Sequence, residues 1–341
     1  MKIVKFMASR SWGGLEKVFV DLCNTIGEKH EVHVIVFADS YVRDYLSQNL
    51  HIHLLKANPT RLNPALYFEL RKMLRRINPD IIHTHGAKSS ELIHRLHMKT
   101  PHIATKHSVS NGRIFNKLRF VTAVSKETLA TVKNEKISQV IYNGIDPVEI
   151  LPSEQTSFVP FRILAVGRLD KIKGFDILIE ECAKLRFDFH LEIVGDGPHR
   201  DILEHLIDTL GMGEKIAVKG FCSDVPQRMQ DANLIVVSSH SEGFGLIVLE
   251  AMFYGKMVLS TPVGIAKEIL PDEFLTTHHT LAKKIEEMYA DSSYFQKRFR
   301  DFALMRKNDF LLESVSEKYL SFYEQIVDPK EIIHDDDKVV N

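Results

Sequence analysis

The sequence predicts an α/β protein built from two tandem doubly wound, Rossmann-like domains. Short apolar runs, each bounded by Gly, Pro or polar residues, alternate with amphipathic stretches. This pattern restarts after a segment that contains Pro and Ser. With 341 residues, of which 44% are hydrophobic, the chain is long enough to form two cores.

The first series of segments reads as β-α-β-α-β. Its members are KIVKFMA (2–8), LEKVFVDLCNTIG (15–27), VHVIVFA (32–38), NPALYFELRKMLRRI (63–77) and DIIHTHG (80–86). Strands that alternate with helices in this way indicate a parallel sheet with helices on both faces.

The second series repeats this plan. Its strands are RILAVG (162–167), FHLEIVG (189–195), IAVKG (216–220), NLIVVSS (233–239) and MVLST (257–261), and its helices are KGFDILIEECAKL (173–185), HRDILEHLIDTL (199–210) and GLIVLEAMFYG (245–255). A linker is expected within 147–160. We therefore expect one domain over 1–150 and a second over 160–310. They are followed by a helix over 311–328 that crosses back to the first domain, and by a polar tail over 329–341.

Cysteine usage and hydropathy predict a cytoplasmic protein. Cys23, Cys182 and Cys222 form neither a C-x-x-C pair nor a metal-ligand spacing, which favours a reducing compartment without disulfides. No apolar stretch approaches the ~18 residues of a membrane span.

The net charge of -1 hides an asymmetry between the two halves. Residues 1–150 contain 22 Lys/Arg and 13 Asp/Glu, a difference of +9, which leaves -10 for the remainder. This indicates an anionic ligand for the first half, or ordinary scatter of solvated charge. We expect no nucleic-acid partner.

Two carboxylates in SEGFGLIVLEAM form a candidate sugar site. Glu242 lies in a Gly-containing turn and Glu250 in the helix that follows. Backbone N–H groups at a helix start bind phosphate or hydroxyl groups, and a nearby carboxylate accepts hydrogen bonds from vicinal hydroxyls. The alternative is that Glu242 is a helix N-terminal charge and Glu250 a solvated helix residue.

Two cations follow another predicted strand. Arg168 and Lys173 lie five residues apart around a turn, where they could neutralise a diphosphate, although surface charge is the alternative. Gly195 in IVGDGP (193–198) provides a tight turn at the next strand end. This turn lacks the complete G-x-G-x-x-G and the acidic partner of a dinucleotide site.

Together these motifs resemble the retaining glycosyltransferases of family 4. The resemblance rests on GGLEK (13–17), DIIHTHG (80–86), VTAVSKET (121–128), YNGID (142–146), VGRLDKIKGFDIL (166–178), IVGDGP (193–198) and EGFGLIVLEAM (242–252). It implies the type B fold, in which an acceptor-side domain and a donor-binding domain face a cleft. It also implies transfer of a hexose-type sugar from a nucleotide-sugar. Class frequency favours a UDP-sugar as this donor. The acceptor implied is a glycan or glycolipid, as in lipopolysaccharide, O-antigen or capsule assembly.

The resemblance also implies roles for individual residues. Arg168 and Lys173 would bind the donor diphosphate, Glu250 the ribose, and Glu242 the transferred sugar. Backbone groups of other residues would approach the donor, namely those of Gly13, Gly14, Gly195, Gly243, Phe244 and Gly245.

The first domain would contribute histidines to the reaction. His107, in IATKHS, matches the family's histidine beside the reacting sugar, and we assign it a catalytic role with Glu242, Arg168 and Lys173. His85 is a weaker acceptor-side candidate. The family implies a reaction without a carboxylate nucleophile, in which the diphosphate helps to remove the acceptor's proton. No cofactor or metal is expected, because the only D-x-D-like cluster, at 335–337, lies in the polar tail.

The helix over 65–77 suggests contact with an anionic membrane surface. It pairs an apolar stripe of Leu66, Leu70, Met73, Leu74 and Ile77 with the cations Arg71, Lys72, Arg75 and Arg76.

Other functions of the protein stay open. The same fold would suit a nucleotide-sugar epimerase or a phosphorylase, and the alternative from another class is a nicotinamide-dependent dehydrogenase or ligand-binding module.

Overall fold

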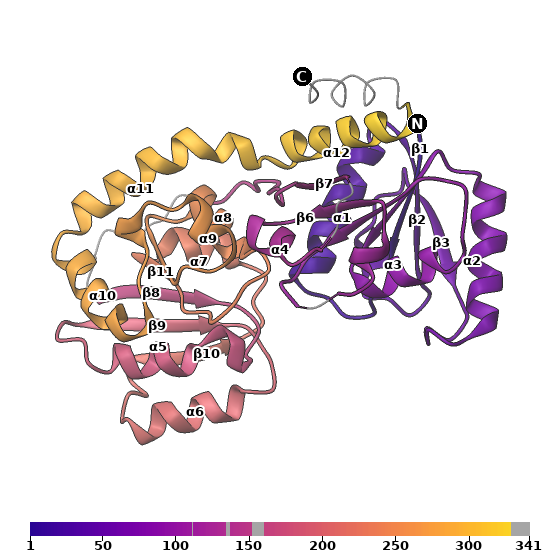
Figure 1. Ribbon diagram of the computed structural model, residues 1–341. Coiled ribbons are helices and arrows are strands. Elements are labelled where there is room, and N and C mark those ends of the chain that lie inside the picture. Colours follow the sequence, from indigo (N-terminus) through magenta and orange to yellow (C-terminus); the bar gives the residue numbers. More distant parts are fainter. Residues whose placement is uncertain (111, 134–136, 152–159, 329–341) are drawn as a thin grey trace. The chain divides into compact units, whose positions relative to one another are not determined.

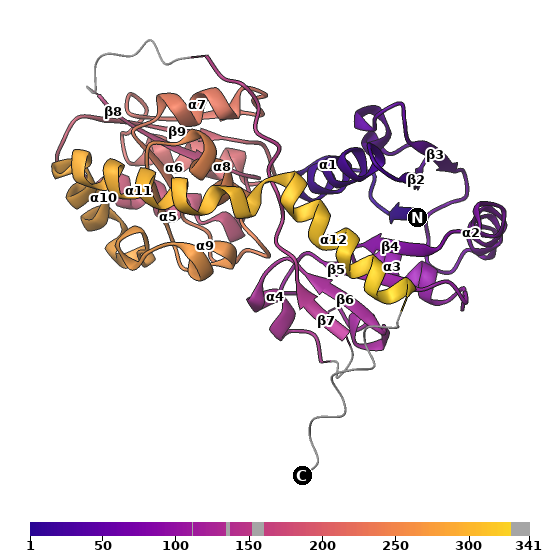
Figure 2. The same ribbon diagram turned by 90° about the horizontal axis from the view of Figure 1, so that it is seen from above.

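The computed structural model describes residues 1–110, 112–133, 137–151 and 160–328. They form two compact units (Figures 1 and 2). The first comprises Met1–Asp146 and the described residues from Phe310 onward, and the second comprises Pro147–Asp309. The predicted polar tail over 329–341 lies outside the described residues.

The first unit contains a seven-stranded parallel sheet in the order β3-β2-β1-β4-β5-β6-β7. Its strands are β1 (Lys2–Met7), β2 (Glu31–Phe37), β3 (His51–Leu55), β4 (Ile81–His85), β5 (His102–Lys106), β6 (Phe120–Ala123) and β7 (Ile137–Val140). Its helices are α1 (Gly14–Gly27), α2 (Pro64–Ile77), α3 (Ala87–His94), α4 (Lys126–Ala130) and α12 (Leu312–Val327), with short 3-10 turns η1 (Tyr41–Tyr45) and η2 (Phe115–Lys117).

Helices cover both faces of this sheet, as predicted for a doubly wound domain. One core joins α1 and α12 to alternate residues of β1 and β2, among them Ile3 and Val34. The other core joins α2 and α3 to the intervening residues, among them Val4 and Ile35. Helix α12 lies beside α1 on its face of the sheet (Figures 1 and 2).

The second unit contains a five-stranded parallel sheet in the order β10-β9-β8-β11-β12. Its strands are β8 (Phe161–Val166), β9 (Phe189–Val194), β10 (Ile216–Gly220), β11 (Leu234–Val237) and β12 (Val258–Ser260). Its helices are α5 (Phe175–Cys182), α6 (Arg200–Thr209), α7 (Val225–Asp231), α8 (Leu246–Tyr254), α9 (Gly264–Ile269), α10 (Leu281–Ala290) and α11 (Ser292–Arg306), with 3-10 turns η3 (Lys171–Lys173), η4 (Asp272–Phe274), η5 (His278–Thr280) and η6 (Lys307–Phe310), the last of which ends at the first residue of the other unit.

The helices of the second unit form two layers around its sheet (Figure 1). Helices α5 and α6 contact each other, as do α7 and α8. The order of the strands reverses direction at β8 and β11, so these two strands mark the switch point of the sheet, where ligands of open parallel sheets bind. The predicted Arg168, Lys173 and Glu242 all follow one of these two strands.

The three cysteines are free, and Cys23 and Cys182 are buried. Burial raises the pKa of the Cys23 thiol to about 12, so this group stays protonated at physiological pH. No helix in the described ranges is both long and apolar enough to cross a membrane.

Candidate active site

The turn between β8 and α5 is shaped by Gly174. Its φ of 61° is left-handed, and a Cβ at this position would lie 2.3 Å from the carbonyl oxygen of Ser238. Glycine alone permits both the conformation and the close approach. The turn therefore packs against the end of β11, which brings Lys173 to the residues that follow that strand.

Lys173 and Glu242 form the centre of the candidate site. The Lys173 ammonium donates to Glu242 Oε1 across 2.5 Å, and the Ser239 hydroxyl donates to the same oxygen across 2.6 Å. The two charged side chains are only 20% and 14% exposed, so solvent screens them less than a surface pair. Two residues that the sequence placed in separate motifs are thus in direct contact.

Arg168 lies outside this hydrogen-bonded group, as far as the described residues show. Its side chain is 72% exposed, and its ion pair with Asp170 spans 3.9 Å. An exposed pair of this length contributes little to stability, so the guanidinium can exchange Asp170 for another anion at low cost. Its role in diphosphate binding stays a prediction.

The segment before α8 presents a helix N-terminus. Gly245 has a φ of 90° and provides no side-chain cap for α8. The Phe244 ring is buried, and its carbonyl accepts a hydrogen bond of 2.7 Å from the Ile265 amide, which fixes the loop. Glu250 is half-buried within α8, about 6 Å along the axis from Leu246. An anion or a sugar hydroxyl would find favourable N–H groups here.

Gly195 has a structural reason to be glycine. Its φ is 148°, and a Cβ would lie 1.9 Å from the carbonyl oxygen of Gly167. The ends of β8 and β9 therefore approach each other more closely than any side chain would allow. This accounts for the glycine without a ligand, and its contact with the donor stays a prediction.

Three further groups, which were not predicted from the sequence, support this site. Ser238 donates to the Lys173 carbonyl across 2.9 Å, and His278 Nε2 donates to the Ser238 carbonyl across 2.8 Å. Ser239 holds Glu242 as described above. The serines carried a signal, because they follow a strand directly. His278 carried none, since it lies 40 residues from the carbonyl it binds.

In the first unit, the predicted histidines form a pair. His85 Nδ1 and His107 Nε2 lie 3.1 Å apart, and their ring centroids are separated by 5.2 Å. Burial lowers the pKa of His107 to about 3, and burial followed by the charge of Lys5 lowers the pKa of His85. Both rings are therefore neutral at physiological pH and can exchange hydrogen bonds with a hydroxyl group.

Gly13 and Gly14 stand at the start of α1, after β1. Gly13 has an extended backbone, and α1 begins at Gly14. The buried Glu16 carboxylate in the first helical turn accepts a hydrogen bond from the Ser9 hydroxyl. An anion that approached this helix start would therefore meet a carboxylate of the chain, and donor contact by these glycines stays a prediction.

A buried lysine lies beneath the histidine pair. Lys5 on β1 contacts His83 Nδ1 at 2.9 Å and donates to the Tyr323 hydroxyl of α12 across 2.7 Å. His83 Nε2 lies 2.6 Å from Thr105 Oγ1. Burial lowers the pKa of Lys5 to about 7. No local pattern predicts that these residues meet, because members of the group lie up to 318 residues apart.

The shifted Lys5 pKa predicts a stability that depends on pH. Unfolded Lys5 stays protonated to about pH 10, whereas folded Lys5 loses its proton near pH 7, so the unfolded state binds more protons and stability rises with pH. We expect the free energy of unfolding to gain about 1.5 kcal/mol between pH 7 and 8.5 from this group. The free energy of unfolding is measured by urea titration at several pH values. Plotted against pH, it should rise less steeply for the Lys5→Met variant than for wild type. The Lys99→Met variant, which changes an exposed lysine, should keep the wild-type slope of this plot. An unchanged slope in Lys5→Met would contradict the assignment.

Two family models match the chain in succession. The model described as Glycosyltransferase Family 4 matches residues 12–149, and the model described as Glycosyl transferases group 1 matches residues 154–303. Together they span both units.

Curated relatives cover most of the chain. N-acetylgalactosamine-N,N'-diacetylbacillosaminyl-diphospho-undecaprenol 4-alpha-N-acetylgalactosaminyltransferase of Campylobacter jejuni is 26% identical over 309 residues, which are 80% of this chain and 84% of that protein. N-acetyl-alpha-D-glucosaminyl L-malate synthase of Bacillus anthracis is 26% identical over 299 residues, which are 76% of this chain and 78% of that protein.

Solved structures share the fold. HepE of Anabaena in complex with UDP-glucose superposes with a TM-score of 0.83 at 22% identity and covers 95% of this chain and 100% of its own. WaaG, a glycosyltransferase involved in lipopolysaccharide biosynthesis, superposes with a TM-score of 0.71 at 17% identity, and the match covers 94% of this chain and 99% of the WaaG chain. These likenesses and the two parallel sheets confirm the predicted type B fold.

Proposed function

This chain belongs to glycosyltransferase family 4, and we propose that it transfers a hexose-type sugar, with retention, from a UDP-sugar to a glycan or lipid-linked acceptor. The observation that carries the proposal is the partly buried Lys173–Glu242 pair, held by Ser239 at the switch point of the second sheet. The pair brings together a cation that can neutralise the leaving group and a carboxylate that can accept hydrogen bonds from sugar hydroxyls.

In the proposed reaction, Lys173 and Arg168 neutralise the diphosphate as the bond to the sugar breaks. Fixed cations of this kind stabilise the developing charge without reorganisation, which is the largest contribution in most reactions of this type. Glu242 accepts hydrogen bonds from the transferred sugar and Glu250 from the ribose. The backbone of Gly243, Phe244 and Gly245 supports the sugar and phosphate.

The acceptor hydroxyl attacks from the side of the leaving group, and the diphosphate takes its proton. The neutral His107, paired with His85, hydrogen-bonds the transferred sugar rather than acting as an acid. A ring that stays neutral at physiological pH suits this role. Because the leaving group is neutralised by side chains, we propose that the transfer itself requires no metal.

The donor and acceptor classes draw support from similar proteins. Solved structures of HepE contain UDP and UDP-glucose, and the Campylobacter jejuni relative is named for an undecaprenol-linked acceptor. A panel of labelled nucleotide-sugars, assayed with and without undecaprenyl-linked glycans, tests both classes. Labelled sugar should appear on the acceptor only with a UDP-sugar and should persist in EDTA.

The panel also separates the alternatives. Isomerised donor without transfer would indicate an epimerase, and phosphate-dependent release of sugar phosphate would indicate a phosphorylase. In a thermal-shift screen with UDP, GDP, ADP and NAD, stabilisation by NAD alone would overturn the transferase proposal.

We propose that helix α2 brings the first unit to an anionic membrane. The helix begins at an Asn63 cap and ends at Asn78 in a left-handed conformation. Leu66, Leu70 and Leu74 are buried against the sheet, which confirms the predicted stripe.

The opposite face of α2 carries charge. Lys72, Arg75 and Arg76 are exposed. Phe68, which precedes Lys72 by about one helical turn, is 72% exposed. Arg71 differs from the expectation, because it is half-buried and donates to the Leu96 carbonyl across 2.7 Å. Three cations and an aromatic ring on one helix suit an anionic lipid surface.

Neutralising this face should weaken binding to anionic vesicles. We expect the triple variant Lys72→Gln/Arg75→Gln/Arg76→Gln to bind phosphatidylglycerol vesicles roughly 10-fold or more weakly in co-sedimentation, because each surface cation contributes about 1 kcal/mol. The matched control is Lys283→Gln/Lys297→Gln/Arg300→Gln in the second unit, which removes the same charge. Equal losses in the two variants would mean that net charge, and not α2, governs binding.

A further inference from the structure

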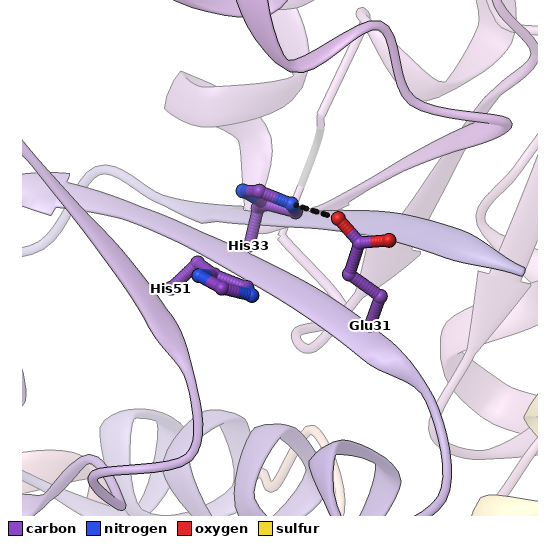
Figure 3. A group of neighbouring side chains, drawn as sticks. All are labelled: Glu31, His33 and His51. Carbon is purple, nitrogen blue, oxygen red and sulfur yellow. Dashed lines mark hydrogen bonds and ion pairs between the residues drawn. The ribbon is translucent and has the colours of Figure 1, made fainter.

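A group of histidines and one glutamate lies on strands β2 and β3 (Figure 3). His33 on β2 pairs in register with His51 on β3. Glu31 precedes His33 by two residues and His53 follows His51 by two, so all four side chains share one face of the sheet. The group lies towards the amino ends of the strands, whereas His85 and His107 lie at or beyond the carboxyl ends.

Three of these residues are spaced for a metal ion. One donor atom from each of Glu31, His33 and His51 lies within 4.8 Å of the other two. Ligand bonds of about 2.0–2.2 Å to a tetrahedral ion place donor atoms roughly 3.4 Å apart, which small side-chain rotations can reach. Glu31 Oε1 and His33 Nε2 are already 3.0 Å apart. A metal ion would replace the proton that these two atoms share.

His53 is placed to orient His33. His53 Nε2 lies 2.8 Å from His33 Nδ1. When Nδ1 carries the proton and donates it to His53, the lone pair of His33 Nε2 points towards Glu31. A second-shell partner of this kind fixes the tautomer and the ring orientation of a ligating histidine, and its loss weakens metal binding by about 10- to 100-fold.

Two cations border the group. Lys2 Nζ lies 3.1 Å from Glu31 Oε1, and Arg76 of α2 acts electrostatically on His53. These charges oppose the binding of a metal cation, and Glu31 supplies the one negative charge among the three ligands. We therefore expect affinity well below that of a closed structural zinc site with four ligands.

We propose that Glu31, His33 and His51 bind a zinc ion that links β3 to β2. Two imidazoles and one carboxylate are a ligand set that zinc accepts, and the exposure of Glu31 and His51 leaves a fourth position for water. Strand β3 is the edge of its sheet, and its side chains are mostly exposed, so a crosslink to β2 would stabilise a weakly held element. The proposed zinc site lies at the opposite end of the strands from His85 and His107, which indicates that the zinc ion would stabilise the sheet and take no part in catalysis.

Isothermal titration of the full-length protein with ZnCl₂, after EDTA treatment and dialysis, tests the proposal. We expect one site with a dissociation constant below about 100 μM and a Tm that rises by roughly 5 °C when zinc is in large excess over this constant. Glu31→Gln and His51→Ala change exposed residues and should lose this site while keeping the wild-type circular dichroism spectrum. His205→Ala, an exposed histidine of α6, should keep it.

His53→Ala gives a second readout. It should retain binding with an affinity lowered by about 10- to 100-fold, which mere loss of a surface histidine would not produce. Zinc binding that is equal in wild type, Glu31→Gln and His51→Ala, or absent below about 100 μM in wild type, overturns the proposal. Transferase activity of His51→Ala should equal that of wild type, so this test and that of the proposed function fail independently.

Discussion

Replacing Lys173 by alanine should lower kcat for sugar transfer by about 10²- to 10³-fold, because a preorganised donor to the developing charge is lost. The Lys173 ammonium is positioned by the Gly174 turn and by Glu242, so a solvent cation would not substitute for it. The measurement is single-turnover transfer with the donor that the panel identifies. Donor affinity should fall less than kcat, since the diphosphate, which already carries two negative charges in the bound donor, gains a third as the bond to the sugar breaks.

Lys171→Ala is the matched control for this experiment. Lys171 lies in the same 3-10 turn but is exposed. Its removal takes one positive charge from the same region without touching Glu242, and kcat should stay within about threefold of wild type. If Lys173→Ala retains kcat within the same range, the cation is structural and the leaving group is stabilised elsewhere.

Gly195→Ala should destabilise the second unit by about 3 kcal/mol or more, which corresponds to a Tm lower by roughly 6–12 °C. The new Cβ would stand 1.9 Å from the Gly167 carbonyl oxygen, and a φ of 148° is strained for any L side chain. Differential scanning calorimetry measures the effect. The ends of β8 and β9 must separate to admit the methyl group, so donor binding should weaken as well.

Gly213→Ala provides the comparison. Apart from Gly213 and its two chain neighbours, no residue of the described chain has a heavy atom within 4 Å of the Cβ that this substitution would add, and the φ of Gly213 lies outside the strained range. We expect a change within about 0.5 kcal/mol, with stabilisation favoured because alanine restricts the unfolded chain. A Gly195→Ala variant as stable as Gly213→Ala would show that the turn relaxes and that the close approach is not required.

The sequence predicted the elements well where their pattern was long and regular. The strands at KIVKFMA and RILAVG, the helix over 63–77 and the parallel arrangement of both sheets are confirmed. These features depend on local alternation of apolar and polar residues, which is visible in any window of the chain. The family and its fold were also predicted, because their motifs are contiguous segments.

The candidate active site was predicted only as separate pieces. Glu242 and Lys173 were each assigned, but their contact was not, since it depends on the close approach of the Gly174 turn to Ser238. His278 carried no local signal, because the chain returns to the site only after α9 and the 3-10 turn η4.

By itself, the sequence determined the fold class and the two-domain plan, since each is written in short-range periodicity or in a contiguous motif. Tertiary structure alone decided which side chains meet. Tyr323 reaches Lys5 across 318 positions, and His33 faces His51 only because β2 and β3 pair in that register. A shift of one residue would turn either histidine to the other face of the sheet, and no local pattern records that choice.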